Sequence, residues 1–283
     1  MPFEANGSGR NAVSPTRACV LVFAGLDPSG GAGLAADVQA IAAAGAHALP
    51  VATVLTAQDN NRVRALHAIA PELVRVQADA LIASIAIAAV KIGIVGSLAN
   101  AHCIAAVITE LRSRRPDLPV VLDPVLASGQ GDALAADDPL DIVAVLMPFV
   151  TLLTPNLPEA AMLCTDTGTG TGEVAQQAAA LLARGASHVL IKGGHDAGEY
   201  VVNRWFATEG TQRSWKTRRL AGSFHGSGCT LASSIAGHLA QQEPMEIAID
   251  RGLGYCQQSL SRAFAIGAGQ LIPQRTVASD ESL

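Results

Sequence analysis

Short apolar runs of strand length alternate along most of this chain with alanine-rich stretches whose apolar residues recur at helical spacing. The run Cys19–Ala24, for example, is followed by Leu34 and Ile41, which lie two turns apart on one helix face. Two later strand-like segments, Tyr200–Ala207 and Thr211–Arg218, predict a hairpin. This order favours an α/β fold, with a mostly parallel sheet covered by helices on both faces.

The two ends of the chain differ in character from the rest. Residues 1–17 are rich in Ser, Gly, Asn and Pro, and we expect them to form a flexible tail. We expect a second tail over residues 271–283, and a single domain over 18–270. The last helix is predicted to run from Pro244 to about Ile266. The low-complexity stretch Thr165–Gly172 is interpreted as a mobile connection.

The composition excludes several classes of protein. Hydrophobic residues make up 49% of the chain and charged residues 15%, which is enough apolar material for a large core. The net charge of −5 and the lack of any basic run disfavour nucleic-acid binding. No apolar run is long enough to span a membrane, and the N-terminus lacks a signal-peptide pattern. The five cysteines are scattered, so we expect reduced thiols and a cytoplasmic location.

Ligands of parallel sheets bind beyond the carboxyl ends of the strands, and the polar motifs of this chain follow its predicted strands. The first motif, Gly25–Gly33, has four glycines around Asp27 and leads into a helix. Glycines let the backbone turn sharply and approach a ligand, and the helix start offers free amides. The motif matches neither a Walker A loop nor the dinucleotide fingerprint. A tight strand-to-helix turn without a ligand is the alternative interpretation.

The second motif, His225–Thr230, contains Gly226, Ser227, Gly228 and Cys229 at the start of a helix. Successive amides at such a position surround an oxyanion or a phosphate. A thiol in the first turn is expected to have a lowered pKa because of the helix dipole. The alternative is a buried cysteine beside a glycine turn.

Four further polar side chains follow strands. Asn156 and Glu159 lie three residues apart, so they predict either a site for magnesium and phosphate or a helix cap. Asp123 is either a site carboxylate or part of an Asp-Pro turn. Lys192 is either a site cation or part of a turn into the hairpin. Lys91 lies within a buried-looking strand, so it either reaches a polar site or pairs with a carboxylate of the core.

Taken in order, seven motifs resemble those of the hydroxymethylpyrimidine/phosphomethylpyrimidine kinases of the ribokinase-like superfamily: AGLDPSGGAG, LTAQ, VKIG, LDPV, TPNLPEA, KGGH and HGSGCT. The resemblance spans about residues 18–270. It implies a three-layer α/β/α sandwich, ATP and Mg²⁺ as cofactors, and a homodimer. The implied reaction is phosphorylation of 4-amino-5-hydroxymethyl-2-methylpyrimidine and then of its monophosphate, in thiamine biosynthesis. A pyridoxal or pyridoxine kinase is the alternative enzyme, and a catalytically silent binding protein is the alternative class.

The resemblance also implies a role for each motif residue. It assigns the pyrimidine to Gly25, Asp37, Gln58, Ile94 and Val125, the transferring phosphoryl group to Gly226, Ser227, Gly228 and Cys229, the nucleotide to Asn156, Lys192 and Gly193, and the metal to Asp123 and Glu159. Cys229 would take the place of the aspartate base of most ribokinase relatives. One departure is the segment Leu126–Asp132, where many relatives have a lysine or a serine. If that lysine contacts phosphate, another group must replace it here.

Overall fold

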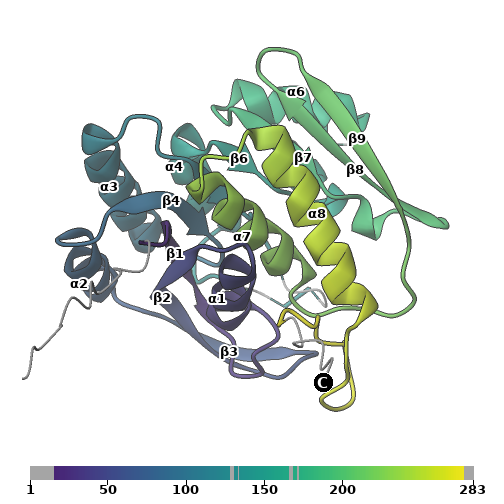
Figure 1. Cartoon of the computed structure of the whole chain (residues 1–283), viewed down its shortest axis with the longest axis horizontal. Helices are drawn as coiled ribbons and strands as arrows, with labels where there is room; N and C mark the ends of the chain where they lie inside the picture. Colours follow the sequence, from purple (N-terminus) through teal and green to yellow (C-terminus); the bar gives the residue numbers. More distant parts are fainter. Residues whose placement is uncertain (1–15, 128–130, 133, 166–167, 171, 277–283) are drawn as a thin grey trace, which may run out of the picture.

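A computed structural model describes residues 16–127, 131–132, 134–165, 168–170 and 172–276. Nine strands of this part form one sheet in the order β3-β2-β1-β4-β5-β6-β7-β8-β9 (Figure 1). The strands are β1 (Cys19–Leu26), β2 (His47–Gln58), β3 (Val63–Ala68), β4 (Ile87–Ile92), β5 (Val120–Leu122), β6 (Leu152–Leu153), β7 (His188–Ile191), β8 (Tyr200–Ala207) and β9 (Gln212–Arg218).

Helices cover both faces of the sheet. One face packs against α1 (Gly33–Ala43), α7 (Ser227–Ala240) and α8 (Met245–Ser261), which lie in front of the sheet in Figure 1. The other packs against α2 (Pro71–Ile82), α3 (Leu98–Arg114), α4 (Pro139–Leu146), α5 (Leu157–Leu163) and α6 (Val174–Ala183). Among the described residues, no helix has both the length and the apolar character that crossing a membrane would require.

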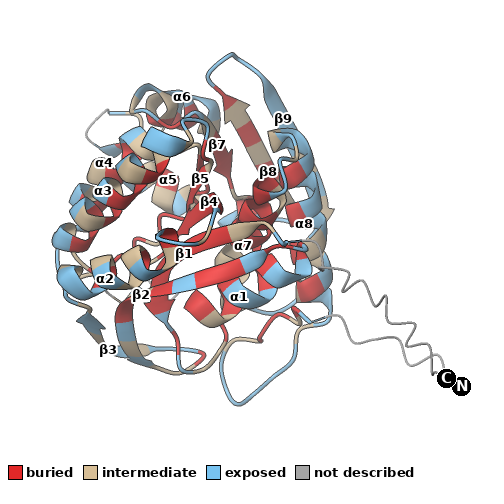
Figure 2. Ribbon diagram, turned by 60° about the vertical axis from the view of Figure 1, so that its left-hand side comes forward, coloured by how far each residue is buried: buried red, intermediate tan, exposed pale blue. Residues whose placement is uncertain are grey.

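The central strand β1 shows how the sequence produces this three-layer arrangement. Val20 and Val22 belong to the core shared with α1 and α7, whereas Leu21 and Phe23 belong to the core on the other face. Successive side chains of a strand point to opposite faces, so a strand buried on both sides must be apolar throughout. Figure 2 shows the buried strands between the two helical layers.

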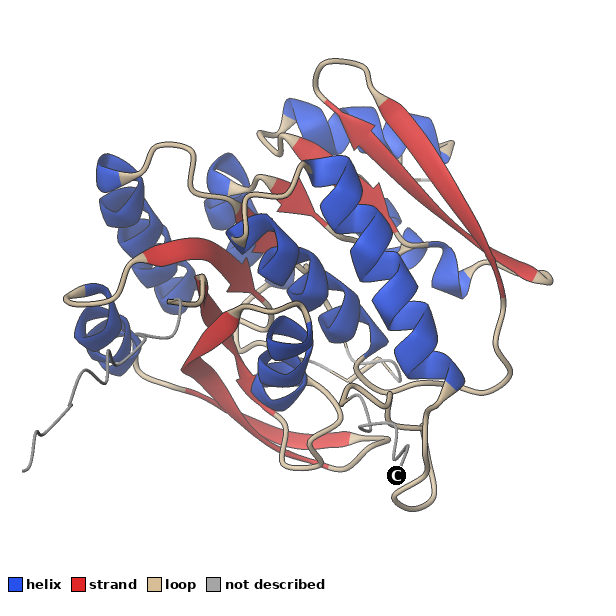
Figure 3. Cartoon of the chain, viewed as in Figure 1, coloured by secondary structure: helices blue, strands red, loops and turns tan. Residues whose placement is uncertain are grey.

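The strand directions confirm the predicted mostly parallel sheet. The neighbours β2-β1, β1-β4, β4-β5, β5-β6 and β6-β7 are parallel. The predicted hairpin is present as β8 and β9, and β8 pairs antiparallel with β7 (Figure 3). Two elements were not predicted. Strand β3 is an exposed edge strand without a clear apolar face, and α4 has only eight residues.

The C-terminal segment differs from the predicted tail. Helix α8 ends at Ser261 and not near Ile266, and the chain then folds back. Leu271 bridges to Phe224, and Ile272 and Arg275 are buried. Residues 271–276 therefore belong to the domain. Their backbone partners are distant in the sequence, so no local pattern predicts this pairing. Residues 277–283, residues 1–15 and part of the predicted connection at 165–172 lie outside the described residues.

A buried ion pair ties the sheet to the helical layer. The Lys91 ammonium on β4 donates to the two carboxylate oxygens of Asp37 on α1, at 2.8 and 2.9 Å. The Ser233 hydroxyl on α7 donates to the same carboxylate at 2.6 Å. Neither charged side chain has any exposed surface. Burial alone would lower the pKa of Lys91, but Asp37 raises it, so the lysine remains charged.

We expect Lys91→Met to lower the free energy of unfolding by about 3–5 kcal/mol, because it leaves the Asp37 carboxylate buried without its partner. Adding Asp37→Leu removes the second charge and should recover part of the loss. Urea unfolding of the wild type, the single variant and the double variant measures both effects. Arg114→Met, which breaks an exposed pair with Glu110, is the control. A loss for Lys91→Met no larger than that of the control would contradict the role of this pair.

Candidate active site

The start of α7 lies against two groups that follow central strands. A β-carbon on Gly228 would be 3.2 Å from Asp123 Oδ2 and 3.2 Å from Lys192 Nζ. Asp123 follows β5, and Lys192 follows β7. Asp123 and Lys192 are joined by an ion pair of 2.7 Å, and Thr154 also donates to Asp123 at 3.0 Å. Two of the predicted motifs therefore meet at the free amides of a helix, where an anion is stabilised.

Asn156 and Glu159 form the helix cap that the sequence left as an alternative. The Asn156 amide N–H donates to Glu159 Oε2 at 2.7 Å, and the Glu159 N–H donates to Asn156 Oδ1 at 2.9 Å. Burial raises the pKa of Glu159 to about 7; Lys192 lowers this pKa and Asp123 raises it. A carboxylate so placed gains from a nearby cation, so the cap does not exclude a role at a metal site.

The glycine-rich turn after β1 is organised around Asp27. Its carboxylate accepts hydrogen bonds from Ser29 N at 2.8 Å and from Ala32 N at 2.8 Å, and His225 Nε2 lies 2.8 Å from Oδ2. Burial tends to raise the pKa of Asp27, but the hydrogen bonds from His225 and Ser29 outweigh it and lower the pKa. The ionised carboxylate thus joins the first glycine motif to the second.

Gln58, at the end of β2, lies beside this link. Its Nε2 is 3.4 Å from His225 Nε2. Because Asp27 is ionised and accepts from His225, the same histidine nitrogen cannot also accept a full hydrogen bond from Gln58. Among the described residues the Gln58 side chain makes no other hydrogen bond, so both ends of its amide remain available to a ligand.

Cys229 lies in the first turn of α7, as predicted, but its thiol is not activated in this structure. Burial raises the pKa of Cys229, and Lys91 and a hydrogen bond from the Gly33 backbone only partly oppose this effect. The predicted lowering of this pKa by the helix start is therefore wrong, because desolvation of the thiolate is the larger effect. Cys19, Cys103, Cys229 and Cys256 carry free thiols.

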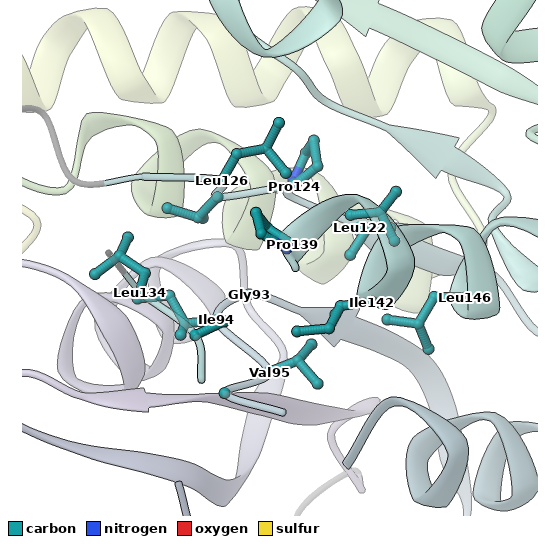
Figure 4. Close-up of a pocket in the computed structure, with 14 residues that line it drawn as sticks. Gly93, Ile94, Val95, Leu122, Pro124, Leu126, Leu134, Pro139, Ile142 and Leu146 are labelled. Atoms are coloured by element: carbon teal, nitrogen blue, oxygen red, sulfur yellow. The ribbon is translucent and has the colours of Figure 1, made fainter. Parts of the chain in front are cut away.

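Apolar residues flank the polar groups at the end of β1. A β-carbon on Gly25 would lie 3.8 Å from the Ile94 side chain. Ile94 and Val125 line a cavity of about 20 Å³, together with residues of α4 (Figure 4). This cavity holds at most a water molecule. Ile94 and Val125 remain partly exposed, so they could also form a wall for a flat ring above the cavity.

Two of the predicted ligand contacts lie beneath the surface. Asp37 is fully buried and satisfied by Lys91 and Ser233, so it has no surface with which to meet a pyrimidine in this conformation. Gly193 is buried, and its N–H donates to Asn203 Oδ1 at 3.2 Å. Lys91 pairs with a carboxylate of the core, which was one of its two predicted roles. In the altered segment Leu126–Asp132, the Asp132 carboxylate pairs with Arg62 at 2.7 Å.

Two residues of the site had no predicted role. The motif that begins with His225 predicts no role for this histidine, and its separation from Asp27 in the sequence hides their contact. Arg275 lay in the predicted tail, yet its guanidinium contacts the start of α7. Among the described residues, no group of three or more His, Cys, Asp or Glu side chains forms a metal site by itself.

We expect the stability of the wild type to fall as the pH rises from 4.5 to 7, through Glu159. The folded-state pKa of about 7 lies above the ordinary value of 4.5, so the folded protein retains a proton that the unfolded chain has lost. Glu159→Gln removes this titration and keeps an oxygen for the cap. Its free energy of unfolding relative to wild type should therefore increase over this pH range and stay level above it.

Unfolding by urea at several pH values measures this difference. Glu159→Ala is the matched control. Its free energy of unfolding relative to wild type should follow the same pH trend, but it should be lower than that of Glu159→Gln by about 1 kcal/mol at every pH, because the cap is lost. A difference between Glu159→Gln and wild type that does not change with pH would contradict the raised pKa.

The chain matches the sequence model of the phosphomethylpyrimidine kinase family over residues 27–274. It is 36% identical to a hydroxymethylpyrimidine/phosphomethylpyrimidine kinase of Streptomyces coelicolor, over 88% of this chain and 91% of that protein. The structure of a phosphomethylpyrimidine kinase from Clostridium difficile 630 superimposes with a TM-score of 0.72 and 29% identity, and covers 86% of this chain and all of that chain.

The ADP complex of Bacillus subtilis pyridoxal kinase superimposes with a TM-score of 0.80 at 24% identity, over 92% of this chain and 98% of that chain. Likeness at this level of identity establishes the shared ribokinase-like fold alone. The sequence match over most of the domain is more specific, and by it this chain belongs to the phosphomethylpyrimidine kinase family.

Proposed function

We propose that this protein transfers the γ-phosphoryl group of ATP to 4-amino-5-hydroxymethyl-2-methylpyrimidine and then to its monophosphate, in thiamine biosynthesis. The main support for this proposal is the set of groups that surround the start of α7. There Gly228 and Cys229 lie beside Asp123 and Lys192, in a chain that belongs to a family of pyrimidine kinases. Phosphoryl transfer depends mainly on positioning and on neutralising charge, which is what these groups offer.

The start of α7 is proposed to hold the transferring phosphoryl group. Gly226 adopts a left-handed backbone conformation, with a φ of +79°, at the N-cap position, and the first amides of the helix that follows have no partner within the helix. These amides and the helix dipole stabilise negative charge. Lys192 is proposed to place a positive charge beside the nucleotide. Asn156 is proposed as a further contact of the nucleotide. Gly193 is buried, so it would act by shaping this turn.

Gln58 is proposed to recognise the pyrimidine. An aminopyrimidine presents a ring nitrogen, which accepts, next to an exocyclic amine, which donates. The free carboxamide of Gln58 can pair with both. Ile94 and Val125 would pack against the ring, and Gly25 would leave room for it. The phenol oxygen of pyridoxal does not match this pair of atoms, which favours the pyrimidine over the alternative substrate.

A magnesium ion fits the carboxylates near the start of α7. Asp123 Oδ2 has no hydrogen bond among the described residues, and Glu159 is poorly solvated. Mg²⁺ prefers oxygen ligands and is usually bound by one or two carboxylates together with substrate phosphates. We propose Asp123 and Glu159 as these carboxylates. The metal would supply neutralisation of phosphate charge.

Two broader proposals concern the setting of the enzyme. Five cysteines scattered along the chain suit a reducing compartment, so we place the protein in the cytoplasm. Leu26 and Leu55 are paired neighbours on β1 and β2 and are 43% and 46% exposed. These apolar side chains support a homodimer in which a second copy covers them.

Purified enzyme with ATP and Mg²⁺ should phosphorylate the hydroxymethylpyrimidine with a higher kcat/KM than pyridoxal. Gln58→Leu should lose about 1–3 kcal/mol of pyrimidine binding, because it leaves polar ring atoms unpaired, and should keep its ATP affinity. Titration calorimetry measures both ligands, with Gln257→Leu, a glutamine far along α8, as the control. Preference for pyridoxal, or equal losses for pyrimidine and ATP, would contradict the proposal.

Cys229 is proposed to accept the proton of the hydroxymethyl group. Its raised pKa means that the thiolate fraction grows with pH throughout the range from 7 to 9. The wild-type kcat/KM should therefore rise with pH over this range. Cys229→Ala should lose this rise and lower kcat by about 10²–10⁴-fold. Cys103→Ala, at a partly exposed thiol on α3, is the control. Near-normal kcat in Cys229→Ala would show that the amides of α7 act without this base.

A further inference from the structure

The C-terminal strap, residues 270–276, packs against both glycine motifs of the site. The Leu271 N–H donates to Ser223 O at 2.9 Å, and the His225 N–H donates to Leu271 O at 2.9 Å. The strap is therefore paired with the backbone that leads directly into α7. At its other end, the Tyr255 hydroxyl of α8 donates to Arg275 O at 2.9 Å. These contacts fix the position from which the Arg275 side chain enters the protein.

The Arg275 side chain joins the turn after β1 to the first turn of α7. Its Nε donates to the Thr230 hydroxyl at 2.8 Å. Its Nη2 donates to Gly31 O and lies 3.4 Å from Gly226 O. Thr230 in turn donates to Gly226 O at 2.8 Å. One planar guanidinium thus holds the two glycine motifs at a fixed separation.

Within the described residues, no carboxylate forms a hydrogen bond or an ion pair with this guanidinium, and Asp37 raises its pKa only through a longer-range interaction. Arg275 is only 2% exposed, and all the acceptors of its hydrogen bonds are neutral oxygens. Within the described part of the chain, its Nη1 has no hydrogen-bond partner at all. A buried charge without a counter-ion costs free energy, and burial accordingly lowers the pKa of Arg275. The helix start next to it is itself electropositive, so the two repel each other.

Both unfavourable effects disappear when an anion binds at the start of α7. The anion would accept hydrogen bonds from the amides directly. It would interact with the guanidinium at longer range, through the backbone that lies between them. Lys192 already has Asp123 as its partner, and Lys91 has Asp37. Among the described residues, Arg275 is the buried cation near this helix start that has no carboxylate in contact with it. The match to the family extends over residues 27–274 and so ends one residue before it.

We propose that Arg275 is a positioning residue of the phosphoryl-transfer site, which sets the separation of the two glycine motifs and leaves an uncompensated positive charge for the transferring phosphoryl group to balance. The proposal rests on the proposed kinase function for its kinetic consequence. Its electrostatic part, an anion site that depends on Arg275, holds for inorganic phosphate as well.

The kinetic test compares Arg275→Ala, Arg275→Gln and Arg275→Lys with wild type. We expect kcat to fall about 10–100-fold in the Ala and Gln variants, while KM for ATP and pyrimidine changes less than about threefold. Arg275→Lys keeps a charge and should recover part of the loss. Arg262→Ala, at an exposed arginine that begins the same C-terminal segment, should behave as wild type. A variant with a lowered Tm but normal kcat would show a merely structural role and overturn the proposal.

Thr230→Val provides the same test in case the Arg275 variants do not fold. It removes the acceptor of the Arg275 Nε–H and leaves the arginine in place, and Thr230→Ser restores the hydroxyl. We expect a lower kcat in the Val variant and recovery in the Ser variant. Equal kcat in both would contradict the clamp.

The electrostatic test uses inorganic phosphate and needs no catalytic activity. Phosphate at a concentration too low for its general salting-out effect should raise the Tm of wild type more than chloride does at equal ionic strength, because it binds a site of the folded state. This difference should be lost in Arg275→Gln and kept in Arg262→Ala. If phosphate stabilises wild type and Arg275→Gln equally, the proposal fails even where the enzyme is an active kinase. If wild type lacks kinase activity but shows the Arg275-dependent effect, only the proposed function fails.

Discussion

The close approach of two backbone turns, at Gly31 and Gly226, is the constraint on which the rest of the site depends. A β-carbon on Gly226 would lie 2.0 Å from Gly31 O, and its φ of +79° is one that other residues rarely adopt. Only a glycine therefore lets the turn after β1 touch the start of α7. The hydrogen bond between Asp27 and His225 and the hydrogen bonds of Arg275 both hold these two turns together.

Charge follows from this geometry. Three cations lie near the start of α7, each from a different element. Lys91 comes from β4, Lys192 follows β7, and Arg275 belongs to the C-terminal strap. Lys91 and Lys192 are paired with aspartates, whereas Arg275 has no carboxylate in contact within the part of the chain that the structure describes. A helix start with one uncompensated cation behind it attracts an anion more strongly than the helix dipole alone. Because the groups are held by buried contacts, they need little reorganisation when charge develops during transfer.

Much of this could be predicted from the sequence, because the relevant signals are local. Alternating apolar runs predicted the parallel sheet, and two later strand-like segments predicted the hairpin of β8 and β9. Properties that depend on tertiary contacts could not be predicted. Arg275 is a single arginine in a segment without a helix or strand pattern, and its contacts form only when the strap folds back. Burial, which a sequence does not show, raises the pKa of Cys229, whereas the helix start alone predicts a lowered pKa. The cap and the site interpretations of Asn156 and Glu159 were both reasonable, because one geometry serves both.

The most direct test of this account is a crystal structure of the enzyme with ADP, aluminium fluoride, Mg²⁺ and the hydroxymethylpyrimidine. Aluminium fluoride mimics the phosphoryl group in the transition state of its transfer. The account predicts that it lies within hydrogen-bond distance of the Gly228 and Cys229 amides, with the hydroxymethyl oxygen in line and near Cys229 Sγ, and with the Gln58 amide on the ring. An aluminium fluoride bound elsewhere, or a ring that does not meet Gln58, would contradict it.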